Sequence, residues 1–393
     1  MSQSRRGVRL LLVPFGLAAA LLAGMTNALL GTCGPFTDTA NDVFCPFVLE
    51  VFYLGITTGT TPTTYDPTSN VTRLQMAAFL SRSVDSVLRR GSRRAALDQF
   101  WATQNAAAVQ LTTVGSFPAL CRCDGGDVWV GNFSSGTVSR VRASDGKVLE
   151  TWTATGAFGV LVAMGRVIVT AATQPGLLYM IDPSQPPGAA TVVASTLGPN
   201  VQSVAFDGAR VWTANATGSV SIVTPGATIP WTVTSVPGFV SPVGALFDGT
   251  NVWVTDSGTS AVPRHLLKLD AAAAILQTVT VGLEPNYPVY DGANIWVPNL
   301  GNDSVTVVRA STGAVLQTLT GNGLSGPRSA AFDGQRVLVT DYNGDAVSIF
   351  KAADLSPLGF ANIGTGVLPY GACSDGVAFW ITFFTASGGL ARF

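Results

Sequence analysis

The chain has 393 residues, of which 47% are apolar and only 11% are charged, and its formal net charge is −1. This composition excludes an intrinsically disordered chain, because disorder goes with low hydrophobicity and high charge. Residues 107–393 carry 13 basic and 17 acidic side chains, so no broad basic field exists there and we expect no nucleic-acid partner. Abundant Gly, Thr, Val and Ser favour an all-β protein with many turns.

The first thirty residues have the pattern of an export signal. Arg5, Arg6 and Arg9 precede the apolar stretch LLLVPFGLAAALLAG, and small residues follow near Ala28. We predict a signal peptide over residues 1–30. The alternative is an uncleaved N-terminal membrane anchor, because the apolar stretch is about long enough to span a bilayer.

Export would place the five cysteines in an oxidising compartment, where disulfides form. Cys33 and Cys45 are a candidate pair, and Cys373 is expected to pair with either Cys121 or Cys123. The Cys-x-Cys spacing without a nearby His or second cysteine pair is a weak metal signal. We therefore expect no metal and no cofactor.

A small helical module is expected over residues 31–86. Apolar residues at helical spacing in CPFVLEVFYLGITTG predict one helix that ends at Gly55. A turn-rich loop follows, and VTRLQMAAFLSRSVDSVL predicts a second amphipathic helix. Thr72 is its expected N-cap, and Gln75 completes a capping box three residues later.

The order of short motifs in this module resembles the S-layer homology domain of bacterial cell-surface proteins. The matching segments are Phe36-Thr37-Asp38, Gly55-Ile56-Thr57-Thr58-Gly59, Tyr65-Asp66-Pro67 and Thr72-Arg73-Leu74-Gln75. The resemblance implies that Thr72, Arg73 and Gln75 bind cell-wall or envelope polysaccharide, with the arginine suited to an anionic sugar substituent. The alternative is a structural or oligomerising module, in which these residues cap the helix and brace the loop.

A basic helical linker is predicted over residues 87–106. Five arginines lie on the expected helix SRSVDSVLRRGSRRAALDQFW, which leads into it: Arg82, Arg89, Arg90, Arg93 and Arg94. We interpret it as a solvated helical face that leads to the next domain. The alternative is a patch that contacts an anionic polymer or lipid headgroups.

Residues 107–393 contain a repeat with a period near 40. Asp-Gly, or Met-Gly in one copy, recurs at gaps of 40 to 43 residues, beginning at Asp124, Met164, Asp207, Asp248, Asp291, Asp333 and Asp375. Such a period indicates a repeat architecture, and Asp-Gly between alternating apolar segments predicts a β-hairpin. A Trp follows five residues after the Asp in five copies, which indicates packing between successive sheets.

Strings such as WVGN, WTAN, WVTD and WVPN resemble the YVTN-type β-propeller repeat. Seven copies predict seven four-stranded blades, and the last copy is one strand short. Residues 107–115 resemble an outer strand, so we expect them to complete the last blade and close the ring. The fold class is therefore all-β, a seven-bladed propeller preceded by the small helical module.

The sequence shows no nucleophile elbow, phosphate loop or zinc-binding helix, and His265 is the only histidine. We expect a non-enzymatic envelope protein whose propeller is a scaffold for a protein or carbohydrate ligand. The alternatives are a propeller enzyme of the streptogramin-lyase or quinoprotein type and a purely structural surface-layer component. Residues that break the repeat near the inner strands are candidate channel lining: Arg122, Tyr287, Tyr290, Arg328 and Tyr370.

Overall fold

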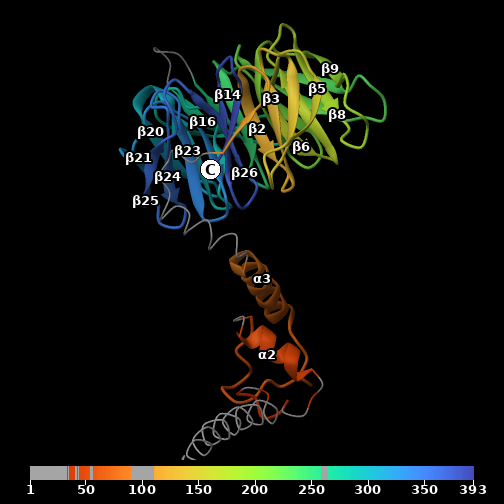
Figure 1. Cartoon of the computed structure of the whole chain (residues 1–393), viewed down its shortest axis with the longest axis vertical. Coiled ribbons are helices and arrows are strands. Elements are labelled where there is room, and N and C mark those ends of the chain that lie inside the picture. The colour runs from red at the N-terminus through yellow and green to blue at the C-terminus, as the bar shows by residue number, and fades with distance from the viewer. Residues whose placement is uncertain are drawn as a thin grey trace, which may run out of the picture. The chain divides into compact units, whose positions relative to one another are not determined.

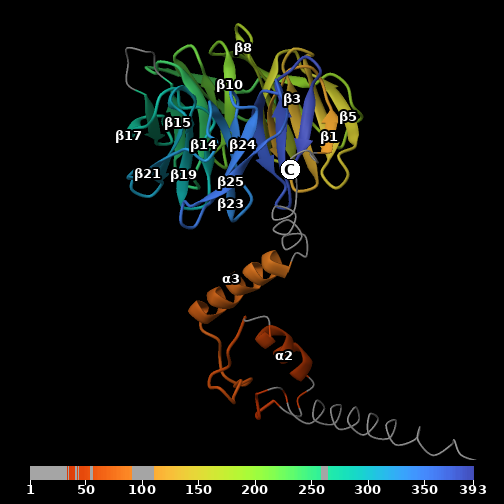
Figure 2. The same cartoon turned by 60° about the vertical axis from the view of Figure 1, so that its left-hand side comes forward.

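The computed structural model describes residues 33, 35–39, 42, 44–53, 56–90, 110–257 and 264–393 (Figures 1 and 2). The predicted export signal and residues 91–106 of the predicted linker lie outside them. The chain divides into two compact units, Met1–Ala102 and Thr103–Phe393. No helix among the described residues is long and apolar enough to cross a membrane.

The first unit contains the helices α2 (Cys45–Tyr53) and α3 (Arg73–Arg90). Its core is aromatic: the Phe36 ring packs edge-on against Phe52 with centroids 5.1 Å apart, and tilted against Tyr65 at 5.6 Å. A disulfide between Cys33 and Cys45 connects the start of the module to the start of α2. These contacts make a small core from residues that are distant in sequence.

The second unit is a seven-bladed propeller of four-stranded antiparallel sheets, as predicted. Blades one to three comprise β2 (Pro118–Cys123), β3 (Asp127–Asn132), β4 (Thr137–Arg142) and β5 (Val148–Thr153); β6 (Ala157–Ala163), β7 (Arg166–Ala171), β8 (Gly176–Ile181) and β9 (Thr191–Leu197); and β10 (Val201–Phe206), β11 (Val211–Asn215), β12 (Ser219–Thr224) and β13 (Thr232–Pro237).

Blades four to six follow the same order from the inner to the outer strand. They comprise β14 (Pro242–Phe247), β15 (Val252–Asp256), β16 (His265–Leu269) and β17 (Ile275–Thr280); β18 (Val289–Tyr290), β19 (Asn294–Asn299), β20 (Ser304–Arg309) and β21 (Val315–Thr320), with the 3₁₀ turn η2 (Leu300–Asn302); and β22 (Pro327–Phe332), β23 (Arg336–Asp341), β24 (Ala346–Lys351) and β25 (Pro357–Asn362).

Blade seven is built from both ends of the propeller sequence. It comprises β26 (Pro369–Ser374), β27 (Phe379–Phe383) and β28 (Gly389–Arg392), and its outer strand is β1 (Gln110–Thr113). β1 pairs antiparallel with β28, from Gln110 opposite Arg392 to Thr113 opposite Gly389. The predicted closure by the early strand is therefore confirmed, and it covers an edge that would otherwise be unpaired.

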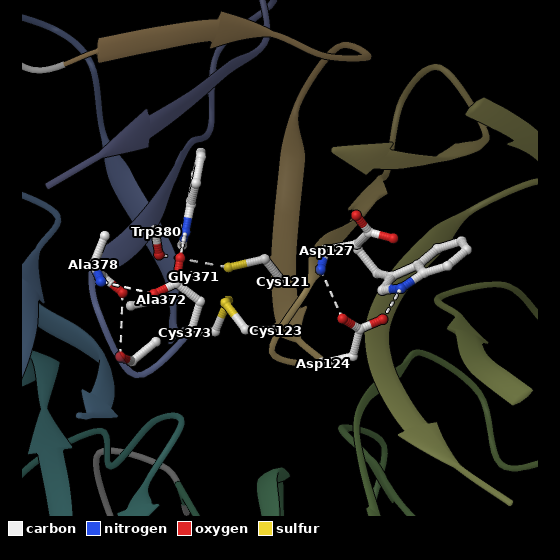
Figure 3. The surroundings of a disulfide bond; sticks show 12 residues. Cys121, Cys123, Asp124, Asp127, Gly371, Ala372, Cys373, Ala378 and Trp380 are labelled. Atoms are coloured by element: carbon white, nitrogen blue, oxygen red, sulfur yellow. Dashed lines mark hydrogen bonds between the residues drawn. A yellow bond between two sulfur atoms is a disulfide. The ribbon is translucent and has the colours of Figure 1, made fainter. Parts of the chain in front are cut away.

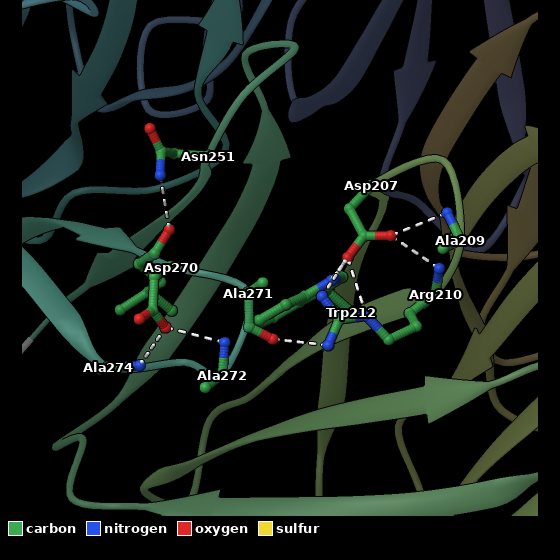
Figure 4. Close-up of polar contacts among 10 residues, drawn as sticks. Asp207, Ala209, Arg210, Trp212, Asn251, Asp270, Ala271, Ala272 and Ala274 are labelled. Carbon is green, nitrogen blue, oxygen red and sulfur yellow. Dashed lines mark hydrogen bonds and ion pairs between the residues drawn. The ribbon is translucent and has the colours of Figure 1, made fainter.

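The Asp-Gly positions form tight turns between the inner and second strands of their blades. In blade three, Asp207 accepts hydrogen bonds from the backbone N–H groups of Ala209 and Arg210 and from Trp212 Nε1 (Figure 4). The same carboxylate-to-indole bond occurs in five blades, with distances of 2.7 to 3.0 Å. The five tryptophans are fully buried, as the predicted packing requires.

Candidate functional site

The clearest candidate site lies where the inner strands meet around the propeller axis. The inner segment of a blade is its inner strand; in blade five it begins at Pro285, which forms a bridge with Asn299. The second residues of the seven inner segments form a ring: Ala119, Phe158, Gln202, Val243, Asn286, Arg328 and Tyr370. Ala119, Phe158, Val243 and Tyr370 belong to one buried cluster, although they come from blades one, two, four and seven. Four blades can share one cluster only near the axis, so these side chains fill one end of the central channel.

Blade five supplies a further side chain because its inner segment is irregular. Pro285 and Pro288 interrupt it, and β18 has only two residues. Tyr287, between the two prolines, joins the central cluster and is buried. Other blades have Gly or Ser at several of the equivalent positions, so the tyrosine is specific to blade five.

A hydrogen-bond network crosses the channel at this level. Tyr287 Oη donates to Gln202 Oε1 at 2.8 Å, and it lies 3.2 Å from Tyr370 Oη. Arg328 Nη2 donates to Tyr370 Oη at 2.7 Å, and its guanidinium carbon lies 4.0 Å from the Tyr370 ring centroid. Blades three, five, six and seven are thereby joined through their side chains.

The electrostatic character of this network is cationic. No described carboxylate lies within ion-pair distance of Arg328, and its buried Nε has no hydrogen-bond partner. Burial lowers the pKa of Arg328, but the surrounding phenols raise it above its ordinary value, so the side chain stays charged. Burial raises the pKa of Tyr287 well above its usual value, so this phenol stays protonated.

An aromatic rim, formed by one residue from each of the adjacent blades six, seven and one, packs against the network. The residue after each second strand donates its N–H to the carbonyl just before the inner segment, as in Phe133 to Phe117, Tyr342 to Gly326 and Phe384 to Leu368. Phe133, Tyr342 and Phe384 pack on the central cluster and remain partly exposed. Phe384 stacks on Tyr370 with centroids 4.6 Å apart, and Tyr342 contacts its edge.

The five residues predicted to line the channel separate into two groups. Tyr287, Arg328 and Tyr370 meet in the network. Arg122 lies further along β2, opposite Trp129. Its side chain is accessible to solvent, although desolvation by the surrounding protein lowers its pKa. Tyr290 packs against the core between blades four and five, and its hydroxyl donates to the carbonyl of Gly292. Sequence reasoning missed Gln202, Phe158 and the rim. An alignment of the seven repeats could have found the first two at the second inner position and the rim at the position after the second strand.

The remaining cysteines lie where the first and last blades meet (Figure 3). Cys123 on β2 forms a disulfide with Cys373 on β26, so the structure selects one of the two predicted pairings. Cys121 is a buried free thiol directed at the carbonyl of Trp380. Burial raises the pKa of Cys121 to about 12, which keeps the thiol protonated and unreactive.

A second candidate site is in the helical module. Asp38 accepts hydrogen bonds from the backbone N–H groups of Tyr65 and Asp66, so two of the motifs contact each other. These hydrogen bonds lower the pKa of Asp38. Thr72 and Gln75 form a reciprocal capping box at the start of α3: Thr72 N–H donates to Gln75 Oε1 at 2.8 Å, and Gln75 N–H donates to Thr72 Oγ1 at 3.2 Å.

Arg73 is exposed at the first turn of α3 and makes no hydrogen bond or ion pair with another described residue. The capping box satisfies backbone donors beside Arg73. Arg73 lies at a helix N-terminus, a position that favours the binding of anions. The family model for the S-layer homology domain matches residues 35–77, which include every motif described above. Residues 35–77 form an S-layer homology domain. Such domains are typical of cell-surface or envelope proteins and generally bind cell-wall polysaccharides.

The propeller is similar to solved structures at low sequence identity. Hydrazine synthase of Kuenenia stuttgartiensis has a TM-score of 0.60 at 16% identity, over 72% of this chain and 98% of that chain. Streptogramin B lyase has a TM-score of 0.58 at 11% identity, over 74% and 99%. The computationally designed protein Ika8 has a TM-score of 0.54 at 12% identity, over 72% and 97%. These likenesses show the fold alone. No match was found among curated proteins.

Proposed function

We propose that this protein is an exported, non-enzymatic component of the bacterial cell envelope. The S-layer homology domain tethers it to wall or envelope polysaccharide, and the propeller is a rigid scaffold for a protein or carbohydrate ligand. The observation that carries the proposal is the family match over residues 35–77, together with the exposed Arg73 beside the capped start of α3. Residues 1–30 direct export, either as a cleaved signal or as an N-terminal anchor.

The tethering part is tested by co-sedimentation of the full chain with purified bacterial cell walls. Arg73→Ala should weaken binding about tenfold, because it removes a charge-assisted contact to an anionic polymer. Arg82→Ala is the matched control, since it removes the same charge from the same helix. Equal recovery of the Arg73 and Arg82 variants would reject the role of Arg73.

The capping pair permits a separate test of the structural alternative. Gln75→Ala removes the acceptor of the Thr72 N–H, which should cost on the order of 1 kcal/mol of helix stability. If Thr72, Arg73 and Gln75 act only as a cap, Gln75→Ala would lower the melting temperature of the module more than Arg73→Ala. Wall binding would then follow stability alone.

A propeller enzyme is the second candidate, because hydrazine synthase and streptogramin B lyase are among the similar structures. A lyase of that type relies on histidine and a metal. This chain has a single histidine, on the third strand of blade four, and no group of three metal-ligating side chains occurs among the described residues. A metal assay on the purified full chain tests this alternative, and one bound metal per chain would favour it over the scaffold.

A further inference from the structure

The Arg328 guanidinium is a cation that has no compensating anion in the described part of the chain. It is partly buried among the phenol rings of Tyr342 and Tyr370, 5.0 and 4.0 Å from their centroids, and no described carboxylate pairs with it. Its Nε is buried without an acceptor. A desolvated charge is costly unless a counter-charge compensates it. Among the described residues only phenols and the amide of Gln202 take part in this network, so an anion from outside would compensate the charge.

One hydroxyl beside the guanidinium, that of Tyr370, can donate to such an acceptor. Tyr287 uses its proton on Gln202 Oε1. Tyr370 Oη accepts from Arg328 Nη2, so its own proton can be donated either to Tyr287, 3.2 Å away, or to a ligand. A planar guanidinium and an adjacent hydroxyl match the two oxygens of a carboxylate.

The rim adds a second requirement on the ligand. Phe133, Tyr342 and Phe384 are partly exposed on the cluster that Tyr370 belongs to, and Tyr342 lies against the Arg328 guanidinium. The described residues of this cluster include no second cation. Aromatic faces pack well against the apolar C–H face of a sugar ring. A polyanion such as a nucleic acid would need several cations to neutralise its phosphates. One cation with an aromatic rim suits a ligand that carries one carboxylate per ring.

We infer that the channel mouth of the propeller, formed by Arg328, Tyr287, Tyr370 and the rim, binds a uronic acid residue of an acidic saccharide. This inference rests on the proposed function of the propeller as a carbohydrate-binding scaffold, and it names the class of carbohydrate. Arg328 contacts the carboxylate, and the rim residues contact the sugar ring.

Isothermal titration calorimetry on the full chain tests this site with tri-galacturonic acid and with its fully methyl-esterified form. Esterification removes the charge and leaves the sugar rings, so the ester should bind at least about tenfold more weakly. This comparison uses the unaltered protein and does not depend on the folding of a variant. Equal affinity for acid and ester, or no binding of the acid, would overturn the inference.

Arg328→Gln should reduce the affinity for the acid by a similar factor and leave the affinity for the ester unchanged. Arg122→Gln is the matched control, because it removes the same charge from another inner strand outside the network. A loss of affinity that is equal in both variants would indicate general electrostatic attraction and contradict the inference. Equal binding of acid and ester would reject the uronic acid site but not the carbohydrate-binding scaffold. The scaffold itself would be rejected if the protein bound no neutral or acidic oligosaccharide on a glycan array.

Discussion

The aspartate of an Asp-Gly turn uses both oxygens of its carboxylate. In Asp207 one oxygen accepts two backbone N–H groups of the turn, and the other accepts the indole N–H of Trp212. Burial alone would raise the pKa of Asp207, but these hydrogen bonds hold it below its usual value. The five-residue spacing between Asp and Trp therefore reflects one hydrogen bond that ties a surface turn to a buried ring.

The copies that lack the tryptophan support this explanation. In blade six Leu338 replaces it, and Asp333 accepts instead from Arg336 Nε at 2.8 Å. In blade two the aspartate is also absent, since Met164 begins the turn and Ile168 lies in the buried core. The turn therefore has an aspartate in those blades where a buried indole or guanidinium N–H donates to it.

Asp341 is a buried carboxyl at a position where blades one, three and five have Asn. Burial raises the pKa of Asp341 from 3.8 to about 8, although the hydrogen bond from Ser348 acts to lower it. Between these values the native state holds a proton that the unfolded state releases, so the free energy of unfolding falls as pH rises from about 4 to 8, by up to about 1.4 kcal/mol per unit. Asp341→Asn should remove this slope and stabilise the protein at pH 8, as measured by urea unfolding across this range.

Asp256→Asn is the matched control for this substitution. Asp256 occupies the equivalent position in blade four, but its two oxygens accept the backbone N–H groups of Val240 and Ser241 at 2.8 and 2.6 Å. An amide can accept with only one of its two terminal atoms, so this variant should be destabilised. An unchanged pH slope in Asp341→Asn would show that another group titrates.

Cys121 gives a chemical readout of global unfolding. Its thiol is buried, and burial raises its pKa to about 12. Iodoacetamide should therefore not label the native protein, and labelling should begin only at denaturant concentrations that unfold the propeller. Mass spectrometry of the alkylated protein measures this, and rapid labelling under native conditions would contradict the burial of the thiol.

At the scale of elements, threonines on second strands connect neighbouring blades. Thr340 Oγ1 accepts from the N–H of Ser329 in its own blade and donates to the carbonyl of Tyr370 in the next, at 3.0 and 2.9 Å. Thr170, Thr255 and Thr382 make the same interblade bond, to Gln202, Asn286 and Ala119. Each bond ends on a residue of the channel ring, so interblade contact and the geometry of the candidate site are linked.

Thr340→Val keeps the shape of the side chain but leaves a buried donor and a buried acceptor without this partner. The variant should lose about 1–3 kcal/mol of stability in chemical unfolding. Thr318→Val is the control, because Thr318 is exposed on the outer strand β21 and a valine suits a strand surface. A loss of the same size in both variants would argue against the interblade bond as the cause.

At the scale of the whole molecule, the ring is closed at blade seven in two places, at the outer strand of the blade and at its inner strand. The outer strand β1 comes from the start of the propeller, and the Cys123–Cys373 disulfide joins the inner strands of blades one and seven. Thr382 adds a hydrogen bond to Ala119 near the axis. A disulfide that spans 250 residues restricts the unfolded chain strongly, and disulfides typically contribute about 2–4 kcal/mol.

Removal of β1 should therefore lower stability. A chain that begins at residue 117 lacks this strand and exposes the edge of β28, whereas a chain that begins at residue 110 keeps it. The shorter chain should have the lower melting temperature in calorimetry under oxidising conditions. Equal melting temperatures for the two chains would mean that β1 does not contribute to closure.

Local and periodic features were predictable because their causes lie within a few residues. Asp-Gly requires a tight turn, and seven turns of this kind predict seven blades. Because the last repeat is one strand short, the sequence also predicts that an earlier segment supplies the outer strand of the last blade. The capping box of Thr72 and Gln75 was likewise predictable, since its partners are three residues apart. The sequence by itself determined the fold, the helix start and the motifs of the S-layer homology domain.

Only the tertiary structure decided which residues meet on the axis and which cysteine pairs. Gln202 and Tyr287 are 85 residues apart, and their contact depends on the closed ring rather than on any local pattern. Cys121 and Cys123 are equivalent in sequence terms, but Cys123 lies beside Cys373 while Cys121 is directed at Trp380. Contacts across the channel arise from the summed geometry of seven blades, which no single repeat encodes.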